Sequence, residues 1–179
     1  MRETPQQYIT RTLGYLEGRE PIEILSATPR QLAALIKGAR KARLAKRPAP
    51  GKWSVAEILG HMADTEGVVG FRIRLILGAN GTPIPGFDQD AWAKFSNYAR
   101  QDPALSLEAF RVNRERTVRL LKTLPPRMWV FYGMHSERGK ETVKRVTEML
   151  AGHDINHLTQ IRRMLPGQRA ARRSPTRRR

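Results

Sequence analysis

The chain of 179 residues contains no cysteine. It therefore forms no disulfide bond, builds no thiolate-ligated zinc site and offers no protein thiol as a nucleophile. It also lacks any apolar run near the roughly 18 residues that span a membrane, and its first residues lack the apolar segment of a secretory signal. We therefore expect a cytoplasmic protein with no membrane segment.

Strand patterns are scarce as well, because alternating apolar and polar residues do not recur along the chain. Helical spacing dominates instead. It predicts helices over residues 4–17, 28–41, 55–77, 105–123 and 142–165, with a short helix near 88–96. The expected fold is all-α, a four-helix bundle with long crossover connections. We place it in one domain, residues 1–166, followed by a disordered Arg-rich tail, residues 167–179.

Two of these helices have clear start signals. Ser54 with Glu57 three residues later forms a capping box, and Trp53 before the cap can pack on Ile58. Thr28 followed by Pro29 suggests a second helix start, since proline suits the first helical position.

The charge is uneven, and acidic residues are absent from two basic segments. The formal net charge is +17, and residues 162–179 hold eight arginines and no acid. A second basic run extends from residue 37 to residue 52. The tail suits weak, nonspecific contact with nucleic-acid phosphates, although no helix-turn-helix, zinc-finger or RNA-binding motif accompanies it. One functional hypothesis is therefore a non-catalytic helical binding module with a nucleic-acid-contacting tail.

Histidines supply a different hypothesis. His153 and His157 are four residues apart, so they share one face of the last predicted helix. That face continues in apolar residues and points inward: Val146, Leu150, Ile161 and Met164. His61 has the same relation to Ile58, Thr65 and Val68 on the helix that starts at Ser54.

Three inward imidazoles from two helices can ligate one divalent metal ion and leave a position open, as catalytic sites do. Spacing alone leaves hydrogen-bonded core histidines as the alternative. The fourth histidine, His135, lies in a connection, where we expect it to be exposed. Residues 153–157, HDINH, resemble the H-E-x-x-H motif of zinc proteases, but no His, Asp or Glu follows His157 to act as a third ligand.

Several polar residues lie close to these histidines in the sequence. Glu57 and Asp64 are candidates to accept a hydrogen bond from His61, although capping and solvation compete for them. Asp154 and Asn156 are expected to point toward a helix edge.

Two motifs carry a family resemblance. Residues 52–66, KWSVAEILGHMADTE, match a W-S-x-x-E-x-x-x-H element, and residues 150–165, LAGHDINHLTQIRRML, match the second element about ninety residues later. Together they resemble the DinB-like family of four-helix-bundle metalloenzymes, over roughly residues 20–165.

The resemblance implies an up-down-down-up bundle in which His61, His153 and His157 bind a divalent metal, zinc or nickel first, with manganese or iron as alternatives. It implies a metal-dependent enzyme that activates water or a low-molecular-weight thiol, as in bacillithiol- and mycothiol-dependent relatives, and often a homodimer. A small-molecule thiol agrees with the absence of cysteine, and the metal would lower its pKa. The Arg-rich extension departs from the usual pattern of the family.

Overall fold

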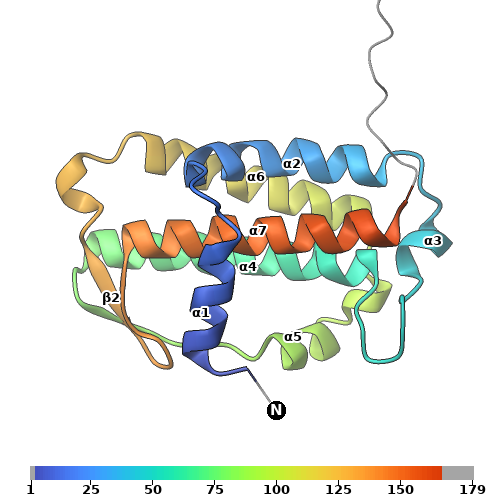
Figure 1. Ribbon diagram of the computed structural model, residues 1–179, viewed down its shortest axis with the longest axis horizontal. Coiled ribbons are helices and arrows are strands. Elements are labelled where there is room, and N and C mark those ends of the chain that lie inside the picture. Colours follow the sequence, from blue (N-terminus) through green and yellow to red (C-terminus); the bar gives the residue numbers. More distant parts are fainter. Residues whose placement is uncertain (1–2, 167–179) are drawn as a thin grey trace, which may run out of the picture.

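A computed structural model describes residues 3–166 of the chain, so the predicted tail at 167–179 lies outside the described residues (Figure 1). Four long helices dominate: α2 (Pro21–Ile36), α4 (Val55–Gly78), α6 (Pro103–Lys122) and α7 (Val143–Met164). Among the described residues, no helix is both long enough and apolar enough to cross a membrane.

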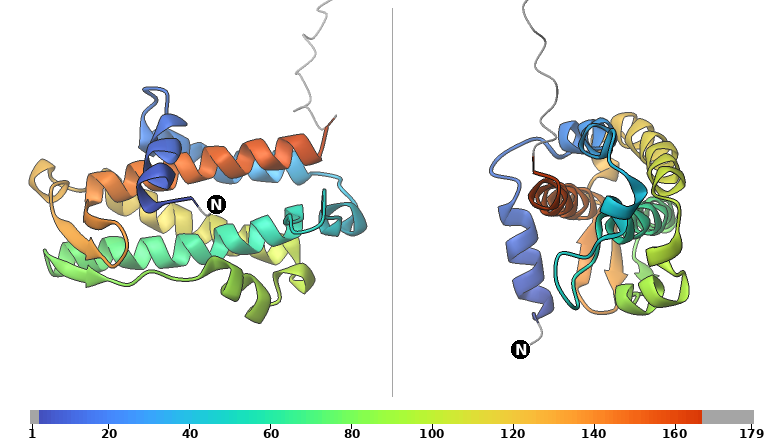
Figure 2. Two further views of the ribbon diagram at one scale, coloured as in Figure 1. Left: turned by 60° about the horizontal axis from the view of Figure 1, so that its bottom comes forward. Right: turned by 90° about the vertical axis from the view of Figure 1, so that its right-hand side faces the viewer.

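These four helices pack around a common core. Helix α2 packs against α6 and α7, and α4 packs against the same two helices. The end-on view on the right of Figure 2 shows the four side by side. Since α2 and α4 lie at opposite corners, the chain between them has to cross the bundle, which it does through the short helix α3 (Lys41–Ala45).

The core is divided into two apolar clusters, one toward each end of the bundle. The first contains residues from all four long helices: Leu25, Ile73, Leu121 and Leu150. The second contains a different residue from each of the same helices: Leu32, Ile58, Phe110 and Leu158. Polar residues that lie between these clusters are therefore surrounded by apolar packing.

The start of α4 agrees with the sequence prediction. The Ser54 hydroxyl accepts a hydrogen bond from the Glu57 backbone N–H at 3.2 Å, and the Glu57 carboxylate accepts one from the Ser54 backbone N–H at 2.8 Å. This capping box satisfies backbone donors that a helix start leaves unpaired. The capping box thereby fixes the N-terminal end of α4, about two helical turns before His61.

The predicted start of the second helix at Thr28 is wrong. Helix α2 begins at Pro21 and continues through Pro29, while the Thr28 hydroxyl donates to the carbonyl of Ile24 at 2.9 Å. A proline inside a helix lacks the N–H that would bond four residues back, which frees the Leu25 carbonyl. Arg114 of α6 donates to that carbonyl at 3.2 Å, so a tertiary contact replaces the missing helical bond.

A small sheet, which the sequence analysis did not predict, lies at one end of the bundle. Its strands are β1 (Thr82–Ile84), β2 (Tyr132–His135) and β3 (Gly139–Thr142). Strand β1 runs parallel to β2, and β2 runs antiparallel to β3. Strands of three or four residues are too short to show a clear period of two. The sequence pattern therefore did not distinguish these strands from connecting loops.

The remaining short elements cover one side of the bundle, as the left view of Figure 2 shows. Helix α1 (Pro5–Gly14) crosses α7, and α5 (Gln89–Phe95) with the 3₁₀ turn η1 (Tyr98–Arg100) lies along α4. A second 3₁₀ turn, η2 (Pro126–Met128), precedes β2. Gly152 permits the close approach of α1, since a Cβ atom there would lie 2.1 Å from the Thr12 carbonyl oxygen. Helix α1 is thus seated directly beside His153.

Candidate metal centre

Helices α4 and α7 bring three imidazole rings together between them. The Nε2 atom of His153 lies 2.9 Å from Nε2 of His61 and 3.1 Å from Nε2 of His157. One nitrogen from each ring can be chosen so that all three lie within 4.8 Å of one another. The inward phase predicted for His61, His153 and His157 is therefore confirmed.

The other ring nitrogens of two of these histidines are directed at oxygen atoms. His157 Nδ1 lies 3.1 Å from the Gln160 side-chain oxygen, and His61 Nδ1 lies 3.5 Å from the Thr65 hydroxyl. A proton on Nδ1 satisfies the Gln160 oxygen and leaves the Nε2 lone pair free. The outer contacts thus favour the tautomer in which the lone pairs point at the shared centre.

Burial keeps two of these imidazoles, His61 and His157, uncharged. It lowers the pKa of His61 far below its ordinary value, and the neighbouring rings of His153 and His157 lower it further. Burial, and next the charge of His153, also lower the pKa of His157 to about 3. Neutral imidazole is the form that binds a metal ion, so His61 and His157 do not have to lose a proton before they act as ligands.

His153 differs from the other two rings. Its side chain is 13% exposed, and its Nδ1 atom is buried without a hydrogen-bond partner among the described residues. The nearest carboxylate oxygen, Asp154 Oδ1, lies 4.0 Å away. His153 is therefore the most exposed member of the cluster.

The donor set fits a divalent metal ion. Three nitrogen ligands at about 2.1 Å in a tetrahedral arrangement lie roughly 3.4 Å apart, close to the 2.9 and 3.1 Å found here. Hydrogen bonds between the Nε2 atoms would require protons on Nε2. The contacts with Gln160 and Thr65 favour the protons on Nδ1 instead. A cation at the centre removes that conflict, and three ligands leave a coordination position for another molecule.

Neither candidate partner of His61 contacts it. Glu57 is committed to the capping box and to an ion pair with Arg47. Asp64 accepts a hydrogen bond from the Tyr98 hydroxyl at 2.6 Å. The residue that does face His61 Nδ1 is Thr65, which the sequence analysis treated only as part of the inward face.

The expected exposure of His135 is wrong. It lies on β2 with only 3% of its surface exposed, and its Nδ1 accepts a hydrogen bond from the Glu137 backbone N–H at 3.1 Å. The sequence placed this residue in a connection, where exposure is expected, but the connection contains a strand of the small sheet, which buries it. His135 is not part of the three-histidine cluster.

A buried charge network, missed in the sequence, adjoins the histidines. Arg114 of α6 donates to Glu66 of α4 at 2.8 Å and to both carboxylate oxygens of Asp154 of α7. All three side chains are essentially inaccessible, so the expectation that Asp154 points to a helix edge is wrong. One available signal was that Arg114 shares helical spacing with the core residues Phe110 and Leu121.

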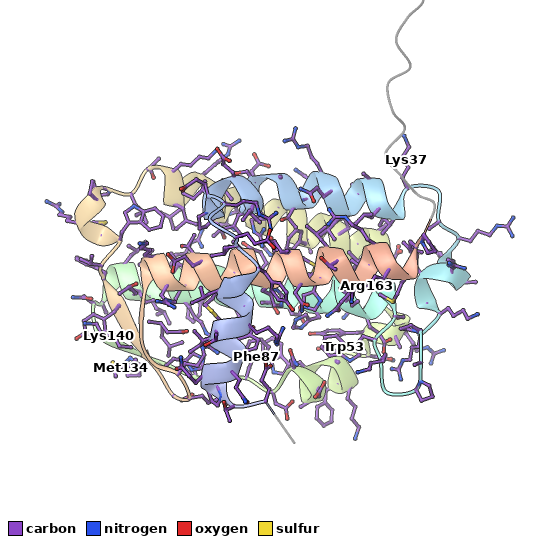
Figure 3. All side chains as sticks on the ribbon, in the orientation of Figure 1. Lys37, Trp53, Phe87, Met134, Lys140 and Arg163 are labelled. Carbon is purple, nitrogen blue, oxygen red and sulfur yellow. The ribbon has the colours of Figure 1, made fainter. Side chains whose placement is uncertain are left out.

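A cavity of about 720 Å³ opens beside the cluster. His61 and His153 form part of its wall, and α1, the loop before α5 and the β2–β3 hairpin form the rest. Figure 3 labels Phe87, another wall residue, which lies in the loop before α5. A smaller cavity of about 270 Å³ reaches His153 and His157 past Trp53. Both volumes suit a small molecule rather than a polymer.

Comparisons with known proteins agree with this geometry. The model of the DinB superfamily matches residues 24–161. A Bacillus subtilis protein named "Putative metal-dependent hydrolase YfiT" is 24% identical over 142 residues, which cover 78% of this chain and 79% of the relative. A protein of Oceanobacillus iheyensis named "Putative metal-dependent hydrolase OB0413" is 27% identical over 121 residues, 66% of this chain and 68% of the relative.

A solved structure is also similar. It is described as "YfiT from Bacillus subtilis is a probable metal-dependent hydrolase with an unusual four-helix bundle topology". The TM-score is 0.73 at 22% identity, and the match covers 91% of each chain. This similarity supports the four-helix-bundle fold. Since the family model spans most of the described residues, the chain belongs to the DinB superfamily.

Proposed function

We propose that His61, His153 and His157 bind one divalent metal ion, and that the protein is a metal-dependent enzyme acting on a small molecule in the adjoining cavity. The observation that carries this proposal is the convergence of three Nε2 atoms within hydrogen-bonding distance. The names of the relatives, which describe metal-dependent hydrolases, support the same reading. The resemblance favours zinc or nickel at the site, with manganese or iron as alternatives.

A divalent cation held by three neutral imidazoles supplies Lewis acidity, which lowers the pKa of a water or thiol that it binds. The chain's own residues orient the ligands and limit access to them. Gln160 and Thr65 hold the outer nitrogens of His157 and His61. Because the chain has no cysteine, a thiol nucleophile would have to be a low-molecular-weight molecule.

We also infer the up-down-down-up topology for the four long helices. The two core clusters support it, since one combines the early part of α2 and α7 with the late part of α4 and α6. The other cluster combines the opposite halves. This arrangement makes α2 and α7 parallel to each other and antiparallel to α4 and α6.

Metal content tests the site. Protein purified without a histidine tag should contain about one divalent ion per chain by mass spectrometry of the elements. His153→Ala should lose that ion, because two imidazoles remain. His135→Gln is the matched control, since it alters a buried histidine outside the cluster, and it should keep the metal. Wild-type protein that takes up no zinc, nickel, manganese or iron on titration would overturn the proposal.

Assays of the metal-loaded protein can show whether the nucleophile is water or a thiol. Turnover of ester or amide compounds without added thiol would identify water as the nucleophile. Turnover of an electrophilic compound only when a low-molecular-weight thiol is added would identify the thiol. His153→Ala should abolish either activity, and His135→Gln should retain it.

A further inference from the structure

Arg72 is a buried cation with no carboxylate partner among the described residues. It is 6% exposed, and its only hydrogen bond among residues 3–166 goes to the Pro85 carbonyl. No carboxylate oxygen of the described residues forms a salt bridge with it, whereas buried Arg114 pairs with Glu66 and Asp154. A buried charge without a counterion is costly. Burial, and next the charge of Arg138, accordingly lower the pKa of Arg72.

Arg72 lies in the wall of the large cavity that also contains His61 and His153. Four residues of α4 form this wall at helical spacing: His61, Thr65, Val69 and Arg72. Arg72 lies eleven positions after His61. This spacing corresponds to about 16 Å along the helix, and it places both residues on nearly the same face. Side chains on a helix lean toward its N-terminus, and because this holds for both residues, about 16 Å remains the separation of the two groups along the helix axis.

The guanidinium is also positioned by aromatic and backbone groups. It lies over the ring of Phe87, 5.5 Å from the centroid, and one of its amino groups is held by the Pro85 carbonyl. The guanidinium nitrogens that do not bond Pro85 are not fully buried, so they remain accessible. A planar fork of donors held in this way is suited to an anion with two coplanar oxygens.

The other charged groups of the cavity wall restrict which anion can bind. Arg138 is neutralised by Glu141, and Glu3 is neutralised by Arg11. The remaining carboxylates belong to exposed residues, Asp88, Asp90 and Glu137. They oppose the entry of a multiply charged anion more strongly than that of a single carboxylate.

We propose that Arg72 forms a carboxylate-binding subsite, and that the molecule processed at the three-histidine centre carries a carboxylate no more than about 16 Å from its reacting group. The subsite deepens the proposed function, because it names the substrate class for the same cavity. Arg72 acts as a positioning and specificity residue, since it is remote from the histidines.

Butanoate binding to metal-free full-length protein tests the subsite without the metal. The side-chain Nε–H signal of Arg72 in a ¹⁵N-labelled sample should shift saturably with butanoate and not with butanamide, its uncharged isostere. Inorganic phosphate should cause a smaller shift than butanoate at equal concentration. Equal responses to butanoate and butanamide, or stronger binding of phosphate, would overturn the proposal.

Variants localise the effect. With Arg72→Gln, butanoate should no longer shift the backbone signals of Gly86 and Ser136, which belong to the cavity wall. Arg74→Gln is the matched control, because it removes an exposed charge from the same helix, and it should respond as wild type does. Arg72→Lys keeps the charge without the fork and should bind butanoate more weakly; it serves if Arg72→Gln fails to fold. Undiminished shifts in both Arg72 variants would overturn the subsite.

A second measurement separates this inference from the metal site. Cobalt-loaded protein should bind 8-mercaptooctanoate roughly tenfold more tightly than 8-mercaptooctanol, because the acid adds a charge-assisted hydrogen bond. Arg72→Gln should remove that preference. Equal affinities with cobalt bound would overturn the subsite and leave the metal centre intact. If the protein takes up neither cobalt nor zinc, nickel, manganese or iron, the proposed function is overturned, and the butanoate titration still decides the subsite.

Discussion

Two polar clusters lie side by side in the interior of this bundle, and they differ in how their buried polar groups are paired. The Arg114 cluster carries its own counterions, because one guanidinium meets Glu66, Asp154 and the Leu25 carbonyl. The histidine cluster consists of three imidazole rings that face one another, and two of them, His61 and His153, line the large cavity. A satisfied network stabilises a core, whereas converging lone pairs require a cation from outside.

Asp154 connects the two clusters. Both of its oxygens accept from Arg114, and one of them lies 4.0 Å from Nδ1 of His153. Substitutions in either cluster should therefore separate a structural role from a ligand-orienting role.

Arg114→Met should destabilise the protein most. It leaves Asp154 and Glu66 buried without a cation, which typically costs about 3–5 kcal/mol in the free energy of unfolding. Urea denaturation of metal-free protein measures the loss. Arg111→Met is the control, since it removes an exposed arginine paired with Glu108 and Glu115 on the same helix, and it should stay close to wild type. A small effect of Arg114→Met would mean that the network is not a structural requirement.

Asp154→Asn should affect both clusters. We expect metal affinity to fall by about tenfold, the lower end of the effect of outer carboxylates on ligating histidines, together with a loss of stability. Metal titration against a competing chelator gives the affinity. Asp64→Asn is the control, since Asp64 bonds Tyr98 and not a histidine. Unchanged metal affinity in Asp154→Asn would show that the two clusters act independently.

Acid should destabilise the histidine cluster before the arginine cluster. Burial lowers the pKa of His61 and His157 in the folded protein, so below about pH 6.5 the unfolded chain binds more protons. The free energy of unfolding should then fall by about 1.4 kcal/mol per pH unit for each of these two rings.

Burial alone would raise the pKa of Asp154, but Arg114 outweighs it and holds that pKa below 3.8. The contribution of the arginine cluster should therefore persist at pH 5. Urea denaturation of metal-free protein between pH 7 and pH 4.5 measures the slope, and His157→Gln should reduce it. A flat profile over this range would contradict the burial of neutral imidazoles.

Glu66→Gln should have the smallest effect, about 1 kcal/mol or less. Burial raises the pKa of Glu66, and one of its oxygens is buried without a partner among the described residues. Asp154 alone can neutralise Arg114. Thermal unfolding compared with Asp154→Asn tests this ranking. A loss as large as that of Arg114→Met would show that Glu66 is an essential counterion.

Helix phase made the histidine site predictable. Ser54 and Glu57 identified the start of α4, and the spacing of three and four residues placed His61, His153 and His157 on inward faces. Residues that act through a distant partner were not predictable in this way. Pro29 looked like a helix start because Arg114, which bonds the Leu25 carbonyl that Pro29 leaves free, lies 89 residues after Leu25 in the chain.

By itself, the sequence determined the helices, the inward direction of three histidines and the absence of a protein thiol, because these depend on local spacing and composition. Tertiary structure alone decided that the three imidazoles meet, that Asp154 turns inward to Arg114, and that Arg72 lies in the cavity wall with no carboxylate partner among residues 3–166. The reason is that hydrogen-bond and ion-pair partners come from helices far apart in the chain. Which buried group is satisfied is therefore settled only when the helices pack.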